Sequence, residues 1–222
     1  MVLSGKLSEK LKSEAKALWT EAAEKEFLVS MAKGTLDTEL FKNYMVQDYL
    51  YLKEYIGILK RIREMAEDEK LAVFLDGIIG DTEYETYKVH VPNLRSLGIS
   101  EEDAAQHQKG QVIVDYMDFM RSRLEEYGIL AGLTALLQCS WNYAYIAAAV
   151  SERYPDELVR SRYKNWFEAY TNKAYIESNR RWIDALDERT ADISNEDVVV
   201  LCEIFKTCAE YENKFWDYLN GC

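Results

Sequence analysis

Residues 128–151, GILAGLTALLQCSWNYAYIAAAVS, form a run of 24 positions without a charged side chain. A helix of this length could span a bilayer. Its middle, however, carries side chains that suit a lipid-facing helix poorly, at Gln138, Cys139, Ser140 and Asn142, and two glutamates, Glu125 and Glu126, stand just before it. We therefore predict a helix that is buried on all sides within a helical bundle, not a membrane span.

The rest of the chain shows the same helical character. Apolar and aromatic residues recur at helical spacing, and no sustained period-two alternation appears. Two prolines and ten glycines are too few breakers for a sandwich or barrel. With 48% hydrophobic and 30% charged residues, a core can form. Because no repeat or linker interrupts the pattern, we predict one all-α domain over residues 1–222.

Breakers and caps set the expected helix bounds. Asp37, Ser100 and Ser194 are expected N-caps, the last as part of a capping box. A kink is expected around Gly77 and Gly80. The predicted helices cover residues 7–27, 37–66, 70–93, 100–127, 128–154, 156–170, 173–187 and 194–219.

Charge and cysteine usage exclude several classes of protein. The net charge is −12 and no Lys/Arg cluster could neutralise a phosphate backbone, so we expect no nucleic-acid partner. The start of the chain lacks a basic segment followed by an apolar one, so we expect no signal peptide. The four cysteines form no CxxC pair and are typical of thiols in a reducing compartment. We therefore expect a cytoplasmic protein without a membrane association.

Three stripes of residues do not resemble plain core. In the first, Tyr44, Asp48, Tyr51 and Tyr55 share one helix face at steps of 4, 3 and 4. The stripe could pack inward with Asp48 paired to a lysine or arginine. Alternatively, a carboxylate among phenols could bind a flat ring that offers hydrogen-bonding edges and stacking faces.

The second stripe lies on the uncharged helix, where Gln138, Cys139, Asn142 and Tyr143 share one sector. A polar seam in so apolar a helix must be hydrogen-bonded or line a cavity. Buried cysteine is usually a small hydrophobe, but the polar neighbours single out Cys139 as a reactive thiol. The other three cysteines have no such polar neighbours and are interpreted as ordinary, unreactive cysteines: Cys202, Cys208 and Cys222.

The third stripe lies on the last helix, as an apolar seam with one acid inside it: Phe205, Cys208, Glu212, Phe215 and Leu219. A glutamate on an apolar face either pairs with a cation or exchanges protons at a raised pKa. In the second case Glu212 could deprotonate a nearby thiol nucleophile.

Familiar catalytic and metal motifs are missing. A di-iron bundle needs Glu-x-x-His pairs, but the residues three before His90 and His107 are Tyr87 and Ala104. The sequence also lacks GxSxG, P-loop, GxGxxG and HExxH motifs. Haem binding by either histidine has no support, and nothing in the sequence calls for a metal or another cofactor.

Four segments in order resemble the TenA/thiaminase II family, specifically its cysteine-containing branch. They are QDYLYL (47–52), CSWNY (139–143), WFEAY (166–170) and EYENKFW (210–216). The resemblance covers nearly the whole chain. It implies a helical bundle of the haem-oxygenase-like type and a homotetramer.

The resemblance also implies roles for particular residues. Cys139 would be the nucleophile, Glu212 the acid/base, and Asp48 the group that binds the amino edge of the substrate. Five aromatic residues would line the pocket: Tyr51, Tyr116, Tyr143, Tyr170 and Phe215. Tyr116 rests only on its spacing back from Cys139, and His90 receives no role.

The implied activity is hydrolysis at the 5-methylene of a 4-amino-2-methylpyrimidine. The substrate would be aminomethylpyrimidine, thiamin or both, and the product would be hydroxymethylpyrimidine, returned to thiamin by salvage. A thiolate that adds to the ring breaks its aromaticity and lets the ring electrons expel the leaving group. The alternatives are a divergent member with an altered substrate and a regulatory protein that only binds a thiamin-related pyrimidine.

Overall fold

A computed structural model describes residues 5–221, and helices make up their regular secondary structure apart from one bridge residue, Ser194. The predicted all-α class is confirmed. The helices are α1 (Leu7–Ala22), α2 (Glu26–Lys33), α3 (Thr38–Met65), α4 (Glu69–Tyr84), the π-helix η1 (Glu85–His90), α5 (Val91–Ser96), α6 (Glu101–Gln106), α7 (Gln111–Tyr127), α8 (Ile129–Arg153), α9 (Pro155–Leu158), α10 (Lys164–Thr171), α11 (Lys173–Arg189) and α12 (Asn195–Leu219).

The chain divides into two compact units. The first combines the described residues up to Leu36 with those from Leu133 onward, and the second is Asp37–Gly132. Helix α8 begins in the second unit and continues in the first. The single domain expected over residues 1–222 stays a prediction.

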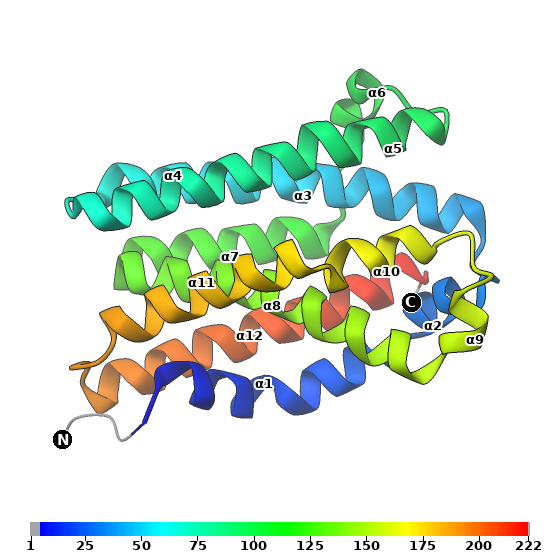
Figure 1. The fold of residues 1–222 in the computed structure, drawn as a ribbon. Helices are drawn as coiled ribbons and strands as arrows, with labels where there is room; N and C mark the ends of the chain where they lie inside the picture. Colours follow the sequence, from blue (N-terminus) through cyan, green and yellow to red (C-terminus); the bar gives the residue numbers. More distant parts are fainter. Residues whose placement is uncertain (1–4, 222) are drawn as a thin grey trace. The chain divides into compact units, whose positions relative to one another are not determined.

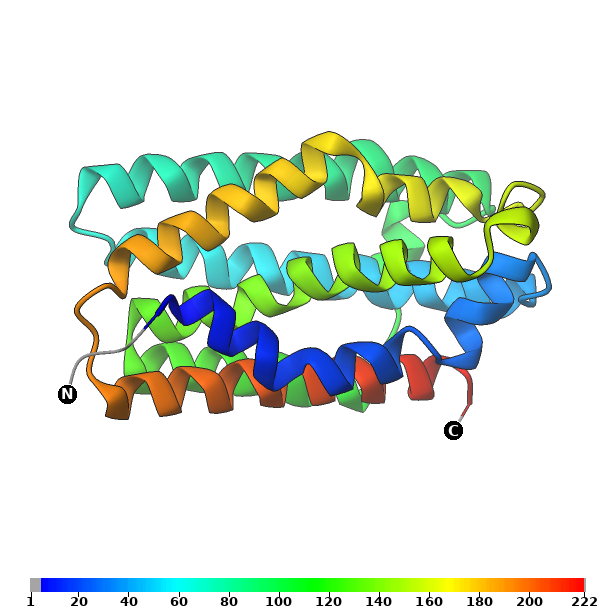
Figure 2. The ribbon, with the colours of Figure 1, turned by 60° about the horizontal axis from the view of Figure 1, so that its bottom comes forward.

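Aromatic side chains build the core of the first unit. Figures 1 and 2 show α1 lying along α12, and the two helices are in extensive contact. At their centre Trp19 of α1 is 1% exposed. Its ring lies within 6 Å of the rings of three residues on α8 and α12: Trp141, Tyr145 and Phe205. Burial of rings of this size is the main stabilisation of this core.

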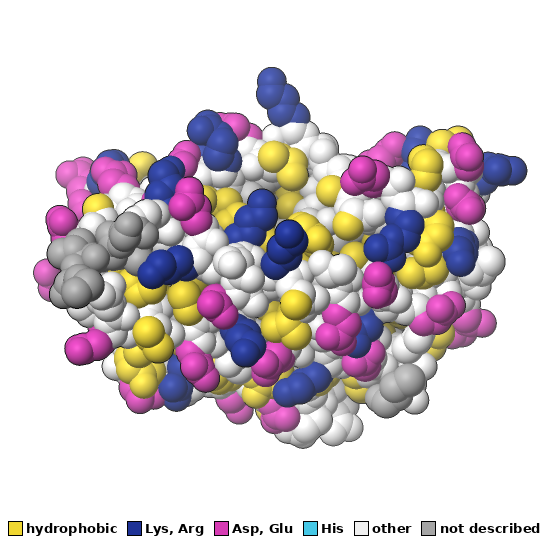
Figure 3. All heavy atoms as spheres, turned by 90° about the horizontal axis from the view of Figure 1, so that it is seen from below, with side chains coloured by type: hydrophobic (Ala, Val, Ile, Leu, Met, Phe, Trp, Pro, Cys, Tyr) yellow, Lys and Arg dark blue, Asp and Glu magenta, His cyan; other side chains and the backbone are white. Residues whose placement is uncertain are grey.

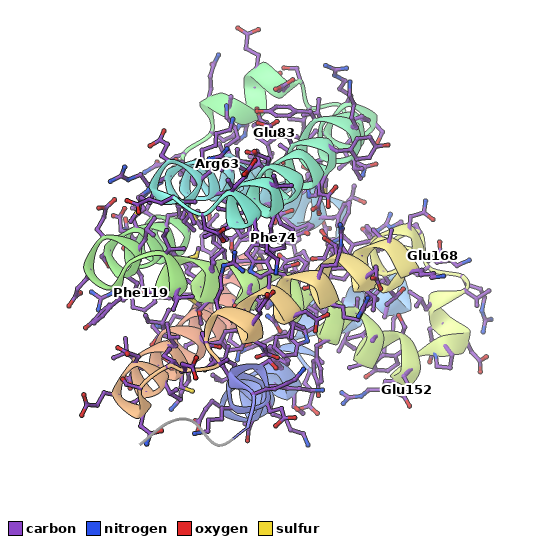
Figure 4. All side chains as sticks on the ribbon, turned by 60° about the vertical axis from the view of Figure 1, so that its left-hand side comes forward. Arg63, Phe74, Glu83, Phe119, Glu152 and Glu168 are labelled. Atoms are coloured by element: carbon purple, nitrogen blue, oxygen red, sulfur yellow. The ribbon has the colours of Figure 1, made fainter. Side chains whose placement is uncertain are left out.

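In the second unit, α3 packs against α4 and α7. Asp37 caps α3 as predicted, because its carboxylate accepts a hydrogen bond from the Glu39 amide. Ion pairs tie α3 to α4 at the surface, from Arg63 to Asp76 at 2.8 Å and from Lys60 to Glu83 at 2.7 Å. Figure 4 labels Arg63 on α3, and Phe74 and Glu83 on α4.

Two glycines shape the start of α8 in the second unit. Gly128, at φ +79°, ends α7 in a conformation that favours glycine, and α8 starts at the next residue. At Gly132 a β-carbon would lie 2.8 Å from Leu124 and 2.9 Å from Ile62. Any larger residue at this position would therefore require the side chains of Leu124 and Ile62 to move.

The segment predicted as one kinked helix over 70–93 is correct in outline but wrong in detail. The irregularity is not at Gly77 or Gly80 but in the π-helical turn η1, which joins α4 to α5. Buried residues recur there every four positions, at Thr82, Thr86, His90 and Leu94. A uniform α-helix of 3.6 residues per turn would rotate such a series off one face, whereas a wider turn keeps it facing inward.

Three other predicted helices are divided in the structure. The helix predicted over 7–27 is divided into two helices, because α1 ends at Ala22 and α2 begins at Glu26. The expected break at Gly34 is confirmed. The prediction for 100–127 is interrupted after Gln106, and α7 restarts behind Gly110. The helix predicted over 156–170 is divided into α9 and α10. The expected caps Ser100 and Ser194 are confirmed, each accepting a backbone hydrogen bond from an aspartate three residues on.

The uncharged run is the buried helix that the sequence predicts. Of residues 129–151 in α8, only Ala148 is exposed. Among the described residues, no helix combines the length and the apolar character needed to cross a bilayer. On the face drawn in Figure 3, Lys and Arg side chains are interspersed with Asp and Glu.

Candidate functional site

The residues that the sequence assigns to a site fall in both units. Asp48, Tyr51 and Tyr116 belong to the second unit, on α3 and α7. The remaining five belong to the first unit, on α8, α10 and α12: Cys139, Tyr143, Tyr170, Glu212 and Phe215. Cys139 is half-buried, and the other seven are buried.

In the second unit, Asp48 is paired with His90, not with the lysine or arginine that one interpretation of the sequence expects. Nε2 of His90 donates to Oδ2 of Asp48 at 2.5 Å, and the hydroxyl of Tyr44 donates to the same oxygen at 3.4 Å. Asp48 is 4% exposed and His90 5%. The two residues therefore form a buried carboxylate–imidazole pair that joins α3 to η1.

The charge state of this pair follows from two opposed effects. Burial lowers the pKa of His90, but the charge of Asp48 and its hydrogen bond raise it more, and Glu85 adds to the rise. The net result is a pKa above the ordinary value of 6.5. The imidazole is thus favoured in its protonated form beside the carboxylate.

Beside this pair, α3 and α7 carry a group of tyrosines. The ring of Tyr51 lies 5.8 Å from that of Tyr55 and 5.7 Å from that of Tyr116. All three side chains are buried. The stripe predicted on α3 therefore packs inward, and Tyr116, placed in the sequence by spacing alone, lies against it.

In the first unit, the residue one turn after Cys139 is the centre of an aromatic cluster. The ring of Tyr143 lies 5.0 Å from Tyr170, 5.9 Å from Trp166 and 5.7 Å from Trp216. Phe215 adjoins it through Trp216 at 5.6 Å. This Tyr143 cluster brings together three of the five predicted aromatic residues, from α8, α10 and α12.

Two ring contacts join α8 to α12, Tyr143 with Trp216 at 5.7 Å and Trp141 with Phe205 at 6.1 Å. Figures 1 and 2 show the two helices running in the same direction. Cys139 lies four residues before Tyr143 on α8, and Glu212 lies four residues before Trp216 on α12. Glu212 is 2% exposed, so its carboxyl group lies within the core of the unit.

Helix α11 holds α8 immediately beside Cys139. The hydroxyl of Ser140 donates to Tyr175 Oη, which in turn donates to the backbone carbonyl of Ser140, each at 3.2 Å. Tyr175 is fixed by its own helix start, where Asn172 accepts a hydrogen bond from the Tyr175 amide. Its ring lies 5.1 Å from Tyr170. Tyr175 thus connects the backbone at the thiol to the Tyr143 cluster.

The polar seam predicted on α8 is buried. Gln138 and Asn142 are both 0% exposed, as is Thr134 one turn earlier. Within the described part of the chain, neither amide atom of Asn142 has a hydrogen-bond partner. A buried amide without partners lowers stability by about 1–3 kcal/mol. Asn142 therefore stays in this helix at a cost to the fold.

The ordinary roles expected for the other cysteines stay a prediction. No disulfide joins the cysteines of residues 5–221. Cys208 is fully buried on α12, and Cys202 is half-buried with a thiol pKa raised by burial and by Glu14. Cys222 lies outside the described residues. In the described part of the chain, no group of three or more His, Cys, Asp or Glu residues could hold a metal ion.

Two residues beside the predicted site were missed by sequence reasoning. The sequence assigns His90 no role, because nothing in its neighbours along the chain reveals that η1 directs it toward Asp48. Tyr175 was not singled out among sixteen tyrosines. The only local signal for Tyr175 was the N-cap at Asn172, three residues before it.

The fold and these side chains define an all-α protein of the haem-oxygenase-like type, with a half-buried cysteine on α8 and a buried glutamate on α12. Residues 12–220 match the model of the TENA/THI-4/PQQC family, and the chain belongs to this family. The family predicted from the four sequence motifs is confirmed.

Named relatives agree with this assignment along nearly the whole chain. An aminopyrimidine aminohydrolase of Helicobacter pylori is 28% identical over 211 residues, covering 95% of this chain and 97% of its own. The protein of that name in Halalkalibacterium halodurans is 25% identical over 207 residues, covering 93% and 92%. The structure of a TenA homologue from P. horikoshii OT3 is 30% identical, covers 97% of this chain and 98% of its own, and superimposes with a TM-score of 0.86.

Proposed function

We propose that this chain is a hydrolase that cleaves the substituent from the 5-methylene of 4-amino-2-methylpyrimidines and releases hydroxymethylpyrimidine for thiamin salvage. The observation that carries the proposal is the buried carboxyl group of Glu212 on α12, one turn before Trp216, whose ring contacts Tyr143 one turn after Cys139 on α8. The names of the relatives from Helicobacter pylori and Halalkalibacterium halodurans support the reaction class.

Cys139 is the nucleophile in this proposal. A thiol with a pKa near 8.5 is mostly protonated at neutral pH, so it needs a base. Glu212 takes the proton, and the thiolate adds to a carbon of the pyrimidine ring. The bond electrons of the disrupted ring then expel the amine from the 5-methylene, and the amine leaves with a proton from Glu212.

Water completes the cycle. It adds to the exposed methylene carbon and gives a proton to Glu212, and the ring expels the Cys139 thiolate as its aromaticity returns. The thiolate then takes this proton back from Glu212, which restores the thiol and the carboxylate. The balance is one aminomethylpyrimidine and one water consumed, and one hydroxymethylpyrimidine and one ammonia formed. The protein supplies both the acid and the base from a single carboxyl group.

The other predicted residues recognise the pyrimidine ring. Asp48 accepts hydrogen bonds from the amino edge of the pyrimidine, because a carboxylate offers only acceptors. The buried rings of Tyr51, Tyr116, Tyr143 and Tyr170, together with Phe215, line the site and exclude water from the reacting atoms. Water exclusion strengthens the hydrogen bonds to the substrate.

The proposal also covers the assembly, the location and the substrates of the enzyme. We propose a single domain in a cytoplasmic homotetramer that takes aminomethylpyrimidine, thiamin or both. The two substrates share the pyrimidine and differ in the leaving group. The pyrimidine groups named above therefore serve both, and the ratio of the two turnover rates defines the preference.

The test is a hydrolysis assay with 4-amino-5-aminomethyl-2-methylpyrimidine and with thiamin in parallel, in which hydroxymethylpyrimidine is identified by mass spectrometry. We expect release of this product from at least one substrate by the wild-type chain without added metal or cofactor. Binding of the pyrimidine without any turnover would contradict the enzyme and favour the binding protein kept as the alternative.

A further inference from the structure

The buried pair of Asp48 and His90 is built by an irregular piece of helix. His90 is the last residue of the π-helix η1, and Pro92 follows within the first turn of α5. Within η1, Tyr87, Lys88 and Val89 are exposed, whereas His90 is buried against α3. The wider turn therefore directs this side chain inward. Turns of this kind are frequent at functional sites.

The hydrogen bonds of Asp48 fall on one of its two oxygens. Both His90 and Tyr44 donate to Oδ2. Within residues 5–221, no hydrogen bond to Oδ1 accompanies them. Oδ1 is also not one of the fully buried side-chain atoms that lack a partner in the described residues, so part of its surface is accessible. Oδ1 is therefore an acceptor that another donor can reach.

Stability alone gives little reason to keep this pair. The desolvation of two buried charges offsets most of their attraction, and apolar replacements of similar volume are often as stable. The pair does fix geometry, because a short hydrogen bond from one side prevents the carboxylate from rotating. It also balances charge, since the imidazolium compensates the carboxylate.

We infer that His90 is a positioning residue for Asp48, which holds Oδ2 so that Oδ1 presents one fixed acceptor to the N–H groups of a neutral 4-aminopyrimidine. This inference rests on the proposed function, in which Asp48 binds the amino edge. Because the pair is neutral overall, it suits a neutral amino-substituted heterocycle better than a cationic group. A heterocycle with an oxo group at the same ring position brings an acceptor against Oδ1 and is rejected.

The experiment compares the wild type with His90→Leu and His90→Gln. Leucine removes the hydrogen bond and the charge, whereas glutamine keeps a neutral N–H donor. His107→Gln is the matched control, because His107 is the other histidine of the chain and lies exposed at the end of α6. Circular dichroism and thermal melting establish that each variant is folded.

The readouts are the calorimetric Kd for 4-amino-5-hydroxymethyl-2-methylpyrimidine and the separate values of kcat and KM. For His90→Leu we expect Kd and KM to rise roughly tenfold to a hundredfold, the range for a lost hydrogen bond to a charged group. We expect kcat to change far less, His90→Gln to recover part of the affinity, and His107→Gln to match the wild type.

The outcomes separate this inference from the proposed function. If the wild type binds and turns over the pyrimidine and His90→Leu does so with the same Kd and KM, only the role of His90 is wrong. The role is equally wrong if His90→Leu and His90→Gln lose kcat alone. A wild type that neither binds nor hydrolyses the pyrimidine contradicts the proposed function, and the inference with it.

If His90→Leu fails to fold, the inference is tested with His90→Gln and by nuclear magnetic resonance of the wild type. With two histidines, the imidazole signals are assigned by the His107→Gln variant. Addition of the pyrimidine is expected to shift the His90 imidazole signals, because the ligand binds the carboxylate that His90 holds. Saturating ligand that leaves these signals unchanged would overturn the inference.

Discussion

Tyr175 and Ser140 share two hydrogen bonds of 3.2 Å, one between their hydroxyl groups and one from Tyr175 Oη to the Ser140 backbone carbonyl. They join α11 to α8 at the residue next to Cys139. The direction of the Cys139 side chain depends on the backbone at this point, so Tyr175 is placed to orient the proposed nucleophile.

Tyr175→Phe removes both hydrogen bonds and keeps the ring. We expect kcat to fall roughly tenfold to a hundredfold, since small displacements of a reacting group carry losses of this size, while KM changes little. The matched control is Tyr145→Phe, which removes a hydroxyl contact of the same helix to Thr20. A rise in KM with kcat unchanged, or equal effects of the two variants, would contradict the role.

Cys139→Ala should fold normally, because the side chain is small and half-buried. We expect turnover to fall on the order of a thousandfold or more, as for other covalent nucleophiles. Cys202→Ala and Cys208→Ala provide the controls, and both should retain activity in the same assay. Equal turnover by Cys139→Ala would exclude the covalent mechanism.

Glu212→Gln tests the acid/base role. The amide is nearly the same size as the carboxyl group but cannot exchange the proton. We expect kcat to fall by about two to four orders of magnitude, with the Kd for hydroxymethylpyrimidine largely kept. A glutamate with a purely structural role would show the reverse pattern, with lost folding or lost binding, and circular dichroism and calorimetry distinguish the two.

Asn142→Leu tests the cost of the buried polar seam. The leucine side chain has a similar size and removes an amide that has no hydrogen-bond partner among the described residues. We expect the free energy of unfolding, measured with urea, to rise by about 1–3 kcal/mol. Thr20→Val at the surface is the control and should have little effect. Destabilisation by Asn142→Leu would mean that the amide is satisfied by bound water.

The pair of Asp48 and His90 predicts a pH dependence of stability. The pKa of His90 is higher in the folded protein than its ordinary value of 6.5. Its contribution is therefore fully present below about pH 6.5 and is lost as the pH rises through the folded-state pKa. We expect the difference in unfolding free energy between wild type and His90→Gln to be larger at acidic than at alkaline pH. A difference that does not vary with pH would contradict the charged pair.

Helix class and position could be predicted from the sequence because they depend on short-range patterns. The caps at Asp37, Ser100 and Ser194 lie where their side chains indicate, and the uncharged run became the buried α8. The segments 7–27, 70–93, 100–127 and 156–170 each contain a break or an irregular turn that the sequence did not locate. Local propensity is a weak guide to such positions, because tertiary context overrides it.

The candidate site could likewise be predicted only in part. Cys139, Glu212 and Asp48 stood out in the sequence because a thiol or acid in an apolar stripe is unusual and needs a reason. The partner of Asp48 could not be read from the chain, because His90 is 42 residues away and reaches it through a π-helical turn. The same holds for Tyr175 and Ser140, 35 residues apart.

Patterns along the chain were enough to establish the helical class, the apolar faces and the chemical groups that are available for a site. Which of those groups meet is a property of the folded chain, because contacts between distant segments depend on helix register and packing. The contacts of Asp48 with His90, of Tyr175 with Ser140 and of Tyr143 with Trp216 are all of this second kind.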